Sequence, residues 1–276
     1  SFNLGKYDEA SEKNIMDENA KMNDVKLRQA IAYAIDTKTA GEKLYNGLYH
    51  PATSLIISFF GDLHDSEVEG YSYDPDKANE LLDEAGYKDV DGDGIREGKD
   101  GKEFKITFAA RKRTEANEAL VQQYIAWWKE VGLNVELYTG RTVEINTFYD
   151  AIQANDASID MYAGGWSTGY DPNPNGLWGE TAPFNMSRFV DEKNTELLDA
   201  IGSVASFDEK TNLKNYKAWQ EYAFEQAFAI PTFESEAITA LNKRVKNFDT
   251  NYGTASENGV ALENIELTAD KGVAAE

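Results

Sequence analysis

The sequence of 276 residues contains no cysteine and only two histidines, His50 and His64. Without cysteine there can be no disulfide, no thiol nucleophile and no cysteine-ligated metal. The two histidines stand apart in the chain, so a zinc site with the usual nitrogen and sulfur ligands is not expected. No GxSxG, P-loop or GxGxxG motif occurs. The common hydrolase and nucleotide-binding signatures are therefore missing.

Long apolar runs and an excess of basic residues are also missing. No stretch approaches the roughly 18 consecutive apolar residues of a membrane-spanning helix. We find no signal peptide, and the opening SFNLGKY has no initiating Met, so we expect a processed or truncated chain. The 27 Lys and Arg residues face 49 Asp and Glu residues, which gives a net charge of −22. This balance disfavours nucleic acid and anionic lipid as partners.

What is present predicts a globular α/β protein. Hydrophobic residues make up 41% of the chain, which is enough to bury a core. Expected strands and helices alternate in the order 104–108, 115–131, 134–138, 143–153 and 159–162. Such alternation predicts right-handed crossovers and a mixed, mostly parallel sheet flanked by helices.

Before this alternation, the sequence predicts a strand and several capped helices. Residues 1–6 are expected to form a strand, and the polar residues 7–23 to be irregular. Either Asn23 or Asp24, and then Asp36 and Asp74, precede segments with helical spacing of apolar residues. Aspartate side chains accept hydrogen bonds from the first turn of a helix, so we expect a helix to begin after each of them.

The run DVDGDG places Asp89, Asp91 and Asp93 at alternate positions before a glycine. Carboxylates spaced in this way can converge on a hard cation, as in the first half of a calcium loop. However, Asp100 stands where an EF-hand has a bidentate Glu, and the flanks predict a helix and then a strand. We keep two interpretations, a bound structural Ca²⁺ and a solvated turn that uses Asp and Gly for the backbone. No other cofactor is expected.

The stretch IDMYAGGWSTGYDPNPNGLW, residues 159–178, holds the strongest candidates for ligand contacts. A short apolar strand ends at a pair of glycines, and Trp166, Tyr170 and Asp171 follow on a loop. In α/β sheets, ligands bind outside the carboxyl ends of strands, on loops aimed by a rigid scaffold. The alternative is that Trp166 and Trp178 fill the core, since Trp is highly buried on average.

Two further features could serve a ligand. Asn185 and Ser187 could donate hydrogen bonds to it, although the polarity of a surface loop explains them as well. Of Trp127 and Trp128 on one helix, we expect one in the core and the other partly exposed, where it could carry a sugar. Five Trp, 15 Tyr and 49 acidic residues make a carbohydrate-active enzyme or a sugar-binding module the alternative function. Hydrolysis would need two carboxylates about 5–9 Å apart beside Trp166.

Five segments resemble, in order, the extracellular solute-binding receptors of peptide- and nickel-type ABC importers. VKLRQAIAYAID resembles the V-R-x-A-[IL]-x-x-A-[IL]-[DN] helix, and YDPDKANELLDEAGY the Y-[DN]-P-x-x-A-x-x-L-L-x-x-A-G-[YF] helix. DVDGDGIREGKDGKEFKITF, LVQQYIAWWKEVGLNVEL and IDMYAGGW resemble the turn, the helix–strand unit and the G-W strand that follow. The resemblance covers about residues 2–233 and is strongest to the oligopeptide-binding branch of Gram-positive bacteria.

The resemblance implies a periplasmic-binding-protein-like lobe. Receptors of this family are much longer than this chain and close two lobes around the ligand. Residues 1–276 correspond to the C-terminal lobe, and residues 240–276 would return as an extended tail to the missing N-terminal lobe. The implied function is to bind oligopeptides and deliver them to a membrane permease, with no catalysis. The receptor would be a monomer, lipid-anchored on the extracellular face of the membrane.

The resemblance also gives residues of the Trp-containing loop a role. In the family, an Asp three residues after the Trp pairs with the peptide ammonium; here that position is Gly169, and the nearest carboxylate is Asp171. An Arg three residues before the Trp can meet a peptide carboxylate, and here it is replaced by Ala163. Longer peptides or another register are therefore expected. The predicted ligand-binding residues are Trp166, Ser167, Tyr170, Asp171 and Asn185.

Overall fold

A computed structural model of the protein describes residues 1–166, 169, 171–236, 238–248 and 262–272. The chain forms two compact units. The larger one consists of residues 1–167 and 172–235, and the smaller one of residues 168–171 and 236–276. Within the described residues, no helix has the length and apolar character needed to cross a membrane.

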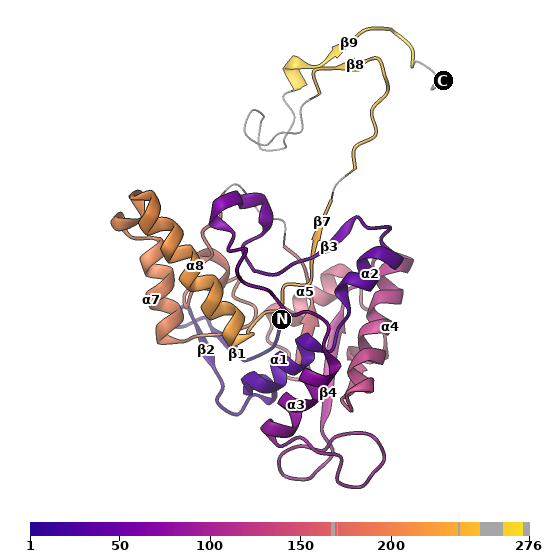
Figure 1. Cartoon of the computed structure of the whole chain (residues 1–276), viewed down its shortest axis with the longest axis vertical. Coiled ribbons are helices and arrows are strands. Elements are labelled where there is room, and N and C mark those ends of the chain that lie inside the picture. Colours follow the sequence, from indigo (N-terminus) through magenta and orange to yellow (C-terminus); the bar gives the residue numbers. More distant parts are fainter. Residues whose placement is uncertain (167–168, 170, 237, 249–261, 273–276) are drawn as a thin grey trace. The chain divides into compact units, whose positions relative to one another are not determined.

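The larger unit is built on a three-stranded parallel sheet (Figure 1). Its strands are β4 (Lys105–Ala110), β5 (Asn134–Leu137) and β6 (Met161–Ala163), arranged in the order β5-β4-β6. Helix α4 (Glu115–Glu130) connects β4 to β5, and α5 (Ile145–Gln153) connects β5 to β6. From β4 the chain runs to β5 on one side of β4, and from β5 it crosses over to β6 on the other side. The prediction of an α/β fold with a parallel sheet and flanking helices is confirmed.

One antiparallel contact adjoins the parallel sheet, which contains no antiparallel strand among the residues that the structure describes. Phe2 forms an isolated antiparallel bridge with Met161 of β6. The strand expected over residues 1–6 is limited to this bridge and to the start of β1 (Gly5–Asp8). Beyond it, β1 pairs with β2 (Lys13–Met16) in a hairpin. The expectation that residues 7–23 are irregular is therefore wrong for this segment.

The helices that the aspartate caps predict are present: α1 (Val25–Tyr33), α2 (Thr37–Leu44) and α3 (Pro75–Ala85). The side chains of Asp24, Asp36 and Asp74 accept hydrogen bonds from the backbone amides of Lys26, Thr39 and Lys77, respectively. Each carboxylate thereby satisfies an amide that the first turn leaves without a partner. Helix α3 ends at Gly86, whose φ of 91° is left-handed, a conformation that glycine adopts without strain.

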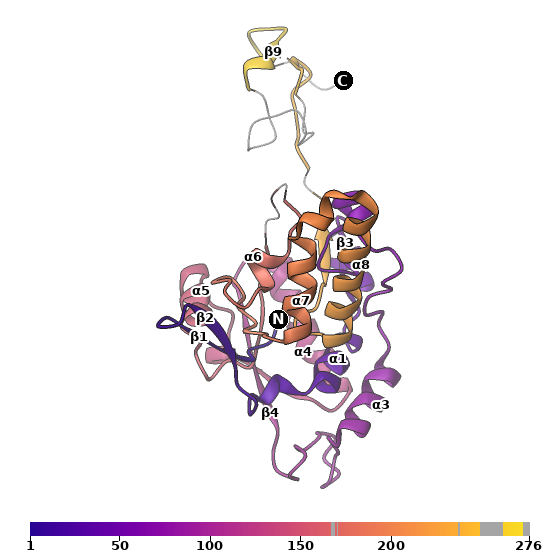
Figure 2. The same ribbon diagram turned by 90° about the vertical axis from the view of Figure 1, so that its left-hand side faces the viewer.

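The remaining elements of the larger unit are β3 (Tyr49–Pro51), α6 (Asn175–Trp178), α7 (Glu192–Ile201), α8 (Glu209–Gln226) and β7 (Phe233–Ser235), with short 3₁₀ turns at Lys21–Asn23, Ser58–Leu63, Tyr138–Gly140 and Val204–Phe207. Helices α7 and α8 lie side by side (Figure 1, Figure 2). Strands β3 and β7 pair antiparallel, with Tyr49 opposite Ser235. This pairing brings residues near 50 together with residues near 234.

The core between the sheet and the first helices is rich in aromatic side chains. Trp127 and Trp128 of α4 are both buried, with 8% and 4% of their surface exposed. Trp128 packs edge-on against Phe108 of β4, with ring centres 5.1 Å apart, and its indole nitrogen donates to the carbonyl of Ile31 in α1 at 3.0 Å. The expectation that one of the two Trp residues is partly exposed is wrong, because Trp127 is covered as well and lies against Tyr73, with ring centres 6.3 Å apart.

The smaller unit contains one short antiparallel pair, β8 (Val245–Lys246) with β9 (Glu266–Leu267), and a 3₁₀ turn at Leu262–Asn264. Arg244 donates from its guanidinium to the carbonyls of Ala269 and Asp270. Among the residues of this unit whose side chains the structure describes, none is buried. Ile238, Leu241 and Leu267 are exposed apolar residues.

Candidate ligand-binding site

The strand order of the parallel sheet identifies the place for a site. In the order β5-β4-β6, the chain moves from β4 to one side of the sheet and then crosses to the other side to form β6. The carboxyl ends of β4 and β6 therefore flank the crevice where α/β sheets bind ligands. Two adjoining pockets lie at these ends, and they share Tyr124, Ala163, Gly164, Trp166 and Thr232.

The first pocket, here the apolar pocket, is surrounded mainly by aliphatic and aromatic side chains. Its lining residues are Ser1, Phe2, Ile31, Ala32, Ile35, Leu55, Phe108, Tyr124, Trp128, Met161, Tyr162, Ala163, Gly164, Trp166, Trp178, Ala229, Ile230 and Thr232. Trp178 is buried and packs against Phe228, with ring centres 5.2 Å apart. Trp166 remains 45% exposed and meets Phe184 edge-on at 5.7 Å. Both earlier interpretations therefore hold in part, since Trp178 belongs to the core and Trp166 to the pocket rim.

The second pocket, here the polar pocket, has aromatic walls and two cationic side chains. Its lining residues are Tyr45, Tyr49, Ala110, Arg111, Arg113, Asn117, Leu120, Val121, Tyr124, Ala163, Gly164, Gly165, Trp166, Thr232, Phe233 and Ser235. Tyr45 and Tyr49 stack with ring centres 4.0 Å apart, and Phe233 packs edge-on against both. Burial raises the pKa of Tyr45 above its ordinary value, so this phenol stays a hydrogen-bond donor.

Neither pocket contains a carboxylate among the described residues that line it. A glycosidase needs two acidic side chains in one cleft, one on each side of the bond that breaks. The buried positions of Trp127 and Trp128 also remove the sugar platform considered on α4. The hydrolase alternative is therefore not supported beside Trp166.

Of the predicted ligand-binding residues, Trp166 lines both pockets. Ser167 and Tyr170 lie outside the described residues. Asp171 is exposed and belongs to the smaller unit, so its pairing with a peptide ammonium stays a prediction.

The structure contradicts the prediction that Asn185 contacts a ligand, because its side chain is completely buried. Its amide nitrogen donates to the carbonyls of Gly179 and Phe189, at 3.2 and 2.8 Å, and its oxygen accepts from the Ser187 hydroxyl at 2.9 Å. All three hydrogen bonds lie within residues 179–189 and stabilise the conformation of this segment. Asn185 is thus neither a surface group nor a group available to a ligand.

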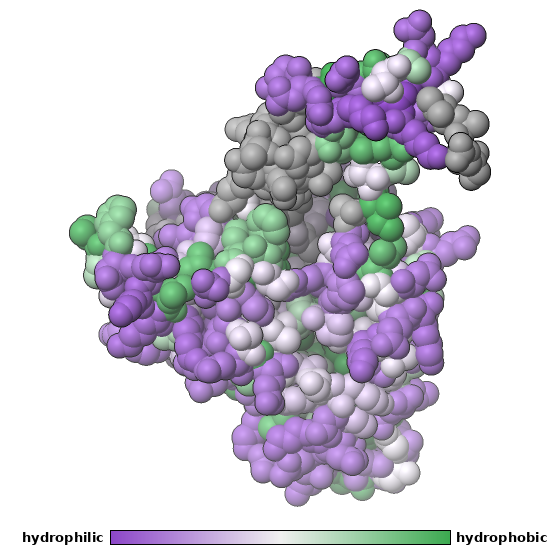
Figure 3. Space-filling view, turned by 45° about the horizontal axis from the view of Figure 1, so that its top comes forward, coloured by the Kyte–Doolittle hydropathy of each residue, from purple (hydrophilic) through white to green (hydrophobic). Residues whose placement is uncertain are grey.

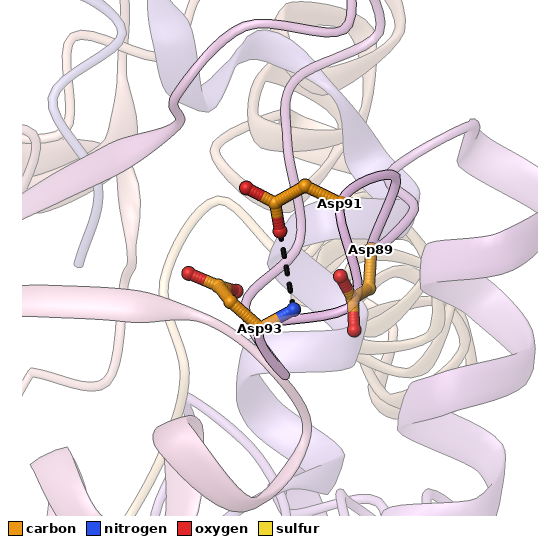
Figure 4. Close-up of side chains that lie close together, drawn as sticks. All are labelled: Asp89, Asp91 and Asp93. Carbon is orange, nitrogen blue, oxygen red and sulfur yellow. Dashed lines mark hydrogen bonds between the residues drawn. The ribbon is translucent and has the colours of Figure 1, made fainter.

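The Asp89, Asp91 and Asp93 side chains are exposed, and one carboxylate oxygen from each lies within 4.8 Å of the others (Figure 4). Asp89 accepts hydrogen bonds from the amides of Gly92 and Gly94, at 2.7 and 3.0 Å. Asp91 accepts from the amide of Asp93 at 3.1 Å, and Asp93 from that of Ile95 at 2.7 Å. The carboxylates therefore already serve the turn, and the same cluster has the oxygen ligands that Ca²⁺ prefers. The calcium site stays a prediction.

Sequence reasoning missed most of the polar pocket. Arg111 and Arg113 directly follow β4, at the carboxyl end where ligands are expected, so their position carried a usable signal. Tyr49 and Phe233 carried none, because they come together only through the pairing of β3 with β7.

The two pockets thus lie at the carboxyl ends of parallel strands, the place where α/β folds bind ligands. Residues 1–188 match the family described as bacterial extracellular solute-binding proteins, family 5 Middle, and the chain belongs to this family. It is a family of solute-binding proteins, as the resemblance implied.

Named relatives are similar over most of this chain. The oligopeptide-binding protein OppA of Lactococcus lactis subsp. cremoris (strain SK11) is 37% identical over 268 residues, which cover 94% of this chain and 44% of that protein. A solved structure of lactococcal OppA complexed with an endogenous peptide, in the closed conformation, is 36% identical with a TM-score of 0.82; the match covers 85% of this chain and 44% of that one.

A more distant structure shares the fold alone. The oligopeptide-binding protein AppA from Bacillus subtilis, in complex with a nonapeptide, is 19% identical with a TM-score of 0.71, over 91% of this chain and 49% of that one. The chain thus spans less than half the length of these relatives.

Proposed function

We propose that this chain is the C-terminal lobe of a two-lobed extracellular receptor that binds oligopeptides and delivers them to the membrane permease of an ABC importer. The observation that carries the proposal is the pair of pockets at the carboxyl ends of β4 and β6, in a chain 37% identical to an oligopeptide-binding protein over 94% of its length. No bond is made or broken. The complete receptor is a monomer, and a lipid anchor outside this chain holds it at the membrane.

In this proposal the pockets form one wall of a cleft, and the missing N-terminal lobe closes over the peptide by a hinge motion. The half-exposed indole of Trp166 is the kind of apolar surface that a second lobe and a ligand would cover. The exposed Ile238, Leu241 and Leu267 in the smaller unit support the same view of residues 240–276, which would return to that lobe.

The peptide would be held mainly through its backbone. Gly164 and Gly165 follow β6 directly and are exposed, so their peptide groups are open to hydrogen bonds from an extended ligand. Asp171 is the proposed partner of the peptide ammonium. The aromatic walls of the two pockets would accommodate side chains of varied size, because aromatic rings offer large contact areas without fixed donor and acceptor patterns.

The test is ligand binding by the complete receptor that contains this chain. Ligands that co-purify with it are identified by mass spectrometry, and its melting is followed with added peptide pools. A peptide at 100 times its dissociation constant should stabilise the receptor by about 2.7 kcal/mol. A receptor that no peptide stabilises, and that carries no peptide when purified, contradicts the proposal.

A matched pair of variants locates the binding to the pockets. Trp166→Ala should weaken peptide binding, since it removes the exposed aromatic wall. Phe207→Ala is the control: Phe207 is 91% exposed in the connection between α7 and α8, which is hydrophobic on the surface shown in Figure 3, and it lines neither pocket. Equal losses in both variants would argue against the assigned site.

A further inference from the structure

The charge of the polar pocket is opposite to that of the chain around it. The sequence has 49 acidic and 27 basic residues, yet the charged side chains among the described residues that line this pocket are Arg111 and Arg113. In so acidic a chain, a pocket lined by two cationic side chains and by no described carboxylate is a local region of positive charge. Clefts lined by one sign of charge concentrate ligands of the opposite sign.

Arg111 is held in place by the sheet. The amide of Val143 donates to Ala110 at 3.0 Å, and the amide of Lys112 donates to Val143 at 2.7 Å, so the backbone on both sides of Arg111 is fixed. Its guanidinium lies over the ring of Tyr149, 5.9 Å from the centre, and donates a long hydrogen bond to the Tyr149 hydroxyl at 3.4 Å. Because stacking leaves the edge of a guanidinium open, Arg111 can still bind a planar anion.

Arg113 stands just before Thr114, which caps α4 through its side chain. Arg113 is exposed, and its charge acts on the nearby Tyr45 hydroxyl, which lines the same pocket. Neither arginine forms an ion pair within the part of the chain that the structure describes. By contrast, Lys21 pairs with Asp160 and Arg96 with Asp83.

The pocket also offers neutral polar groups next to the arginines. The Asn117 side-chain oxygen is buried and has no hydrogen-bond partner among the described residues. A buried polar atom without a partner costs free energy, which a ligand N–H group would relieve. Glu118 follows Asn117 in the first turn of α4 but does not line the pocket. One of its carboxylate oxygens accepts a hydrogen bond from the Thr142 hydroxyl.

We propose that the polar pocket is a carboxylate subsite, in which Arg111 and Arg113 bind a carboxylate of the peptide. Both guanidinium groups can donate paired hydrogen bonds to the two oxygens of that group. The carboxylate is either the C-terminus of the peptide or an Asp or Glu side chain. The inference rests on the proposed function, and it adds a preference for peptides that carry a negative charge at this place.

The test uses four hexapeptides with one common sequence. They combine a free or an amidated C-terminus with a Glu or a Gln at one internal position. Affinities are measured by calorimetry on the complete receptor, as wild type and as Arg111→Gln, Arg113→Gln and the double variant. The control is Lys112→Gln, which removes the same charge from the residue between the two arginines but lies outside the pocket lining.

For the wild type we expect roughly tenfold tighter binding of peptides that carry the recognised carboxylate, as charge-assisted hydrogen bonds predict. The double variant should lose this preference, so that its affinities for the four peptides become equal to one another. Lys112→Gln should keep the preference. A preference that follows the C-terminal amide identifies the terminal carboxylate, and one that follows Glu against Gln identifies a side chain.

Three results would overturn the subsite. They are equal wild-type affinities for all four peptides, an equal loss for all four in the arginine variants, and the same loss in Lys112→Gln. In each case the amidated Gln peptide still binds, so the proposed function stands. If none of the four peptides and no peptide pool binds the wild type, the proposed function fails together with the subsite. Circular dichroism checks that each variant is folded, and Arg113→Gln, at an exposed position, provides a variant with little effect on the core.

Discussion

Arg28 shows how one buried side chain can join two distant helices. Its guanidinium, in α1, is 1% exposed and donates to the carbonyls of Met22, Gln226 and Ala227. Two of these carbonyls close the C-terminal end of α8, where helix carbonyls lack partners and carry a partial negative charge. Burial lowers the pKa of Arg28 to about 10. The arginine of the family's first sequence motif therefore serves the fold and not the ligand.

Arg28→Met should destabilise the chain by about 2–4 kcal/mol, because the carbonyls of Met22, Gln226 and Ala227 lose this donor in buried or partly buried positions. Lys26→Met, on the same helix, is the control, since the Lys26–Glu84 ion pair is exposed and solvent screens such a pair. Urea denaturation of both variants measures the difference. Equal midpoints for Arg28→Met and the wild type would contradict the structural role.

At the residue scale the sequence could predict part of the site. Trp166 was found because a strand, two glycines and a loop mark the place, and Ala163 marked a missing arginine. Arg111 and Arg113 were not found, because they are far from Trp166 in sequence and line the same pocket only when β4 and β6 pair. Asn185 was misjudged because an asparagine on a loop has the same sequence pattern whether its amide faces solvent or a buried turn.

At the scale of elements, local chemistry decided what could be predicted. Helices α1, α2 and α3 begin at aspartate caps, which act within one turn and are therefore visible in the sequence. The hairpin of β1 and β2 has no such signal, since it depends on distant residues. The buried amide of Asn14 in β2 donates to the carbonyls of Glu180 and Ala182. Contacts of this kind override local propensity.

The end of α3 gives a test of a predicted element boundary. Gly86→Ala should cost about 1–2 kcal/mol, because alanine is strained at the left-handed φ of 91°. Gly176→Ala in α6 is the matched control: Gly176 is exposed, and an added Cβ would meet nothing within 4 Å. There we expect no loss, or a gain of up to about 1 kcal/mol. Thermal unfolding of both variants measures the difference in stability. Equal effects would contradict the role of Gly86 as the C-terminal cap of α3.

The two interpretations of residues 89–94 can be separated by a calcium titration. A Ca²⁺ ion that binds the folded chain must raise its melting temperature, and Asp91→Asn should abolish that rise by removing a charged ligand. Magnesium is the control cation. A melting temperature that does not respond to calcium leaves the hydrogen-bonded turn as the role of these aspartates.

At the scale of the whole molecule, the hydrophobic core is confined to one unit. All three clusters of buried apolar side chains lie within residues 2–229. The described side chains of residues 236–276 contribute none. The length and charge of the chain gave no hint of this division. It becomes understandable if the tail, as proposed, normally packs on the missing lobe.

A chain that ends at residue 236 should therefore keep the fold of the larger unit. We expect its melting temperature and the cooperativity of its unfolding to stay close to those of the whole chain, because no described buried contact is removed. Calorimetry compares the two chains. A broad or strongly lowered transition in the shorter chain would show that the tail contributes to the core after all.

Because the tryptophans differ in exposure, the intrinsic fluorescence of this protein can report on its pockets. Four of the five, Trp127, Trp128, Trp178 and Trp219, are 8% exposed or less, whereas Trp166 is 45% exposed at the rim of both pockets. Emission excited at the red edge should therefore report mainly on Trp166, and acrylamide should quench mainly that residue. A ligand that covers the indole will shift this emission to the blue and protect it from quenching, and Trp166→Phe will remove both signals. Occupancy of the pockets can then be followed in real time without any label.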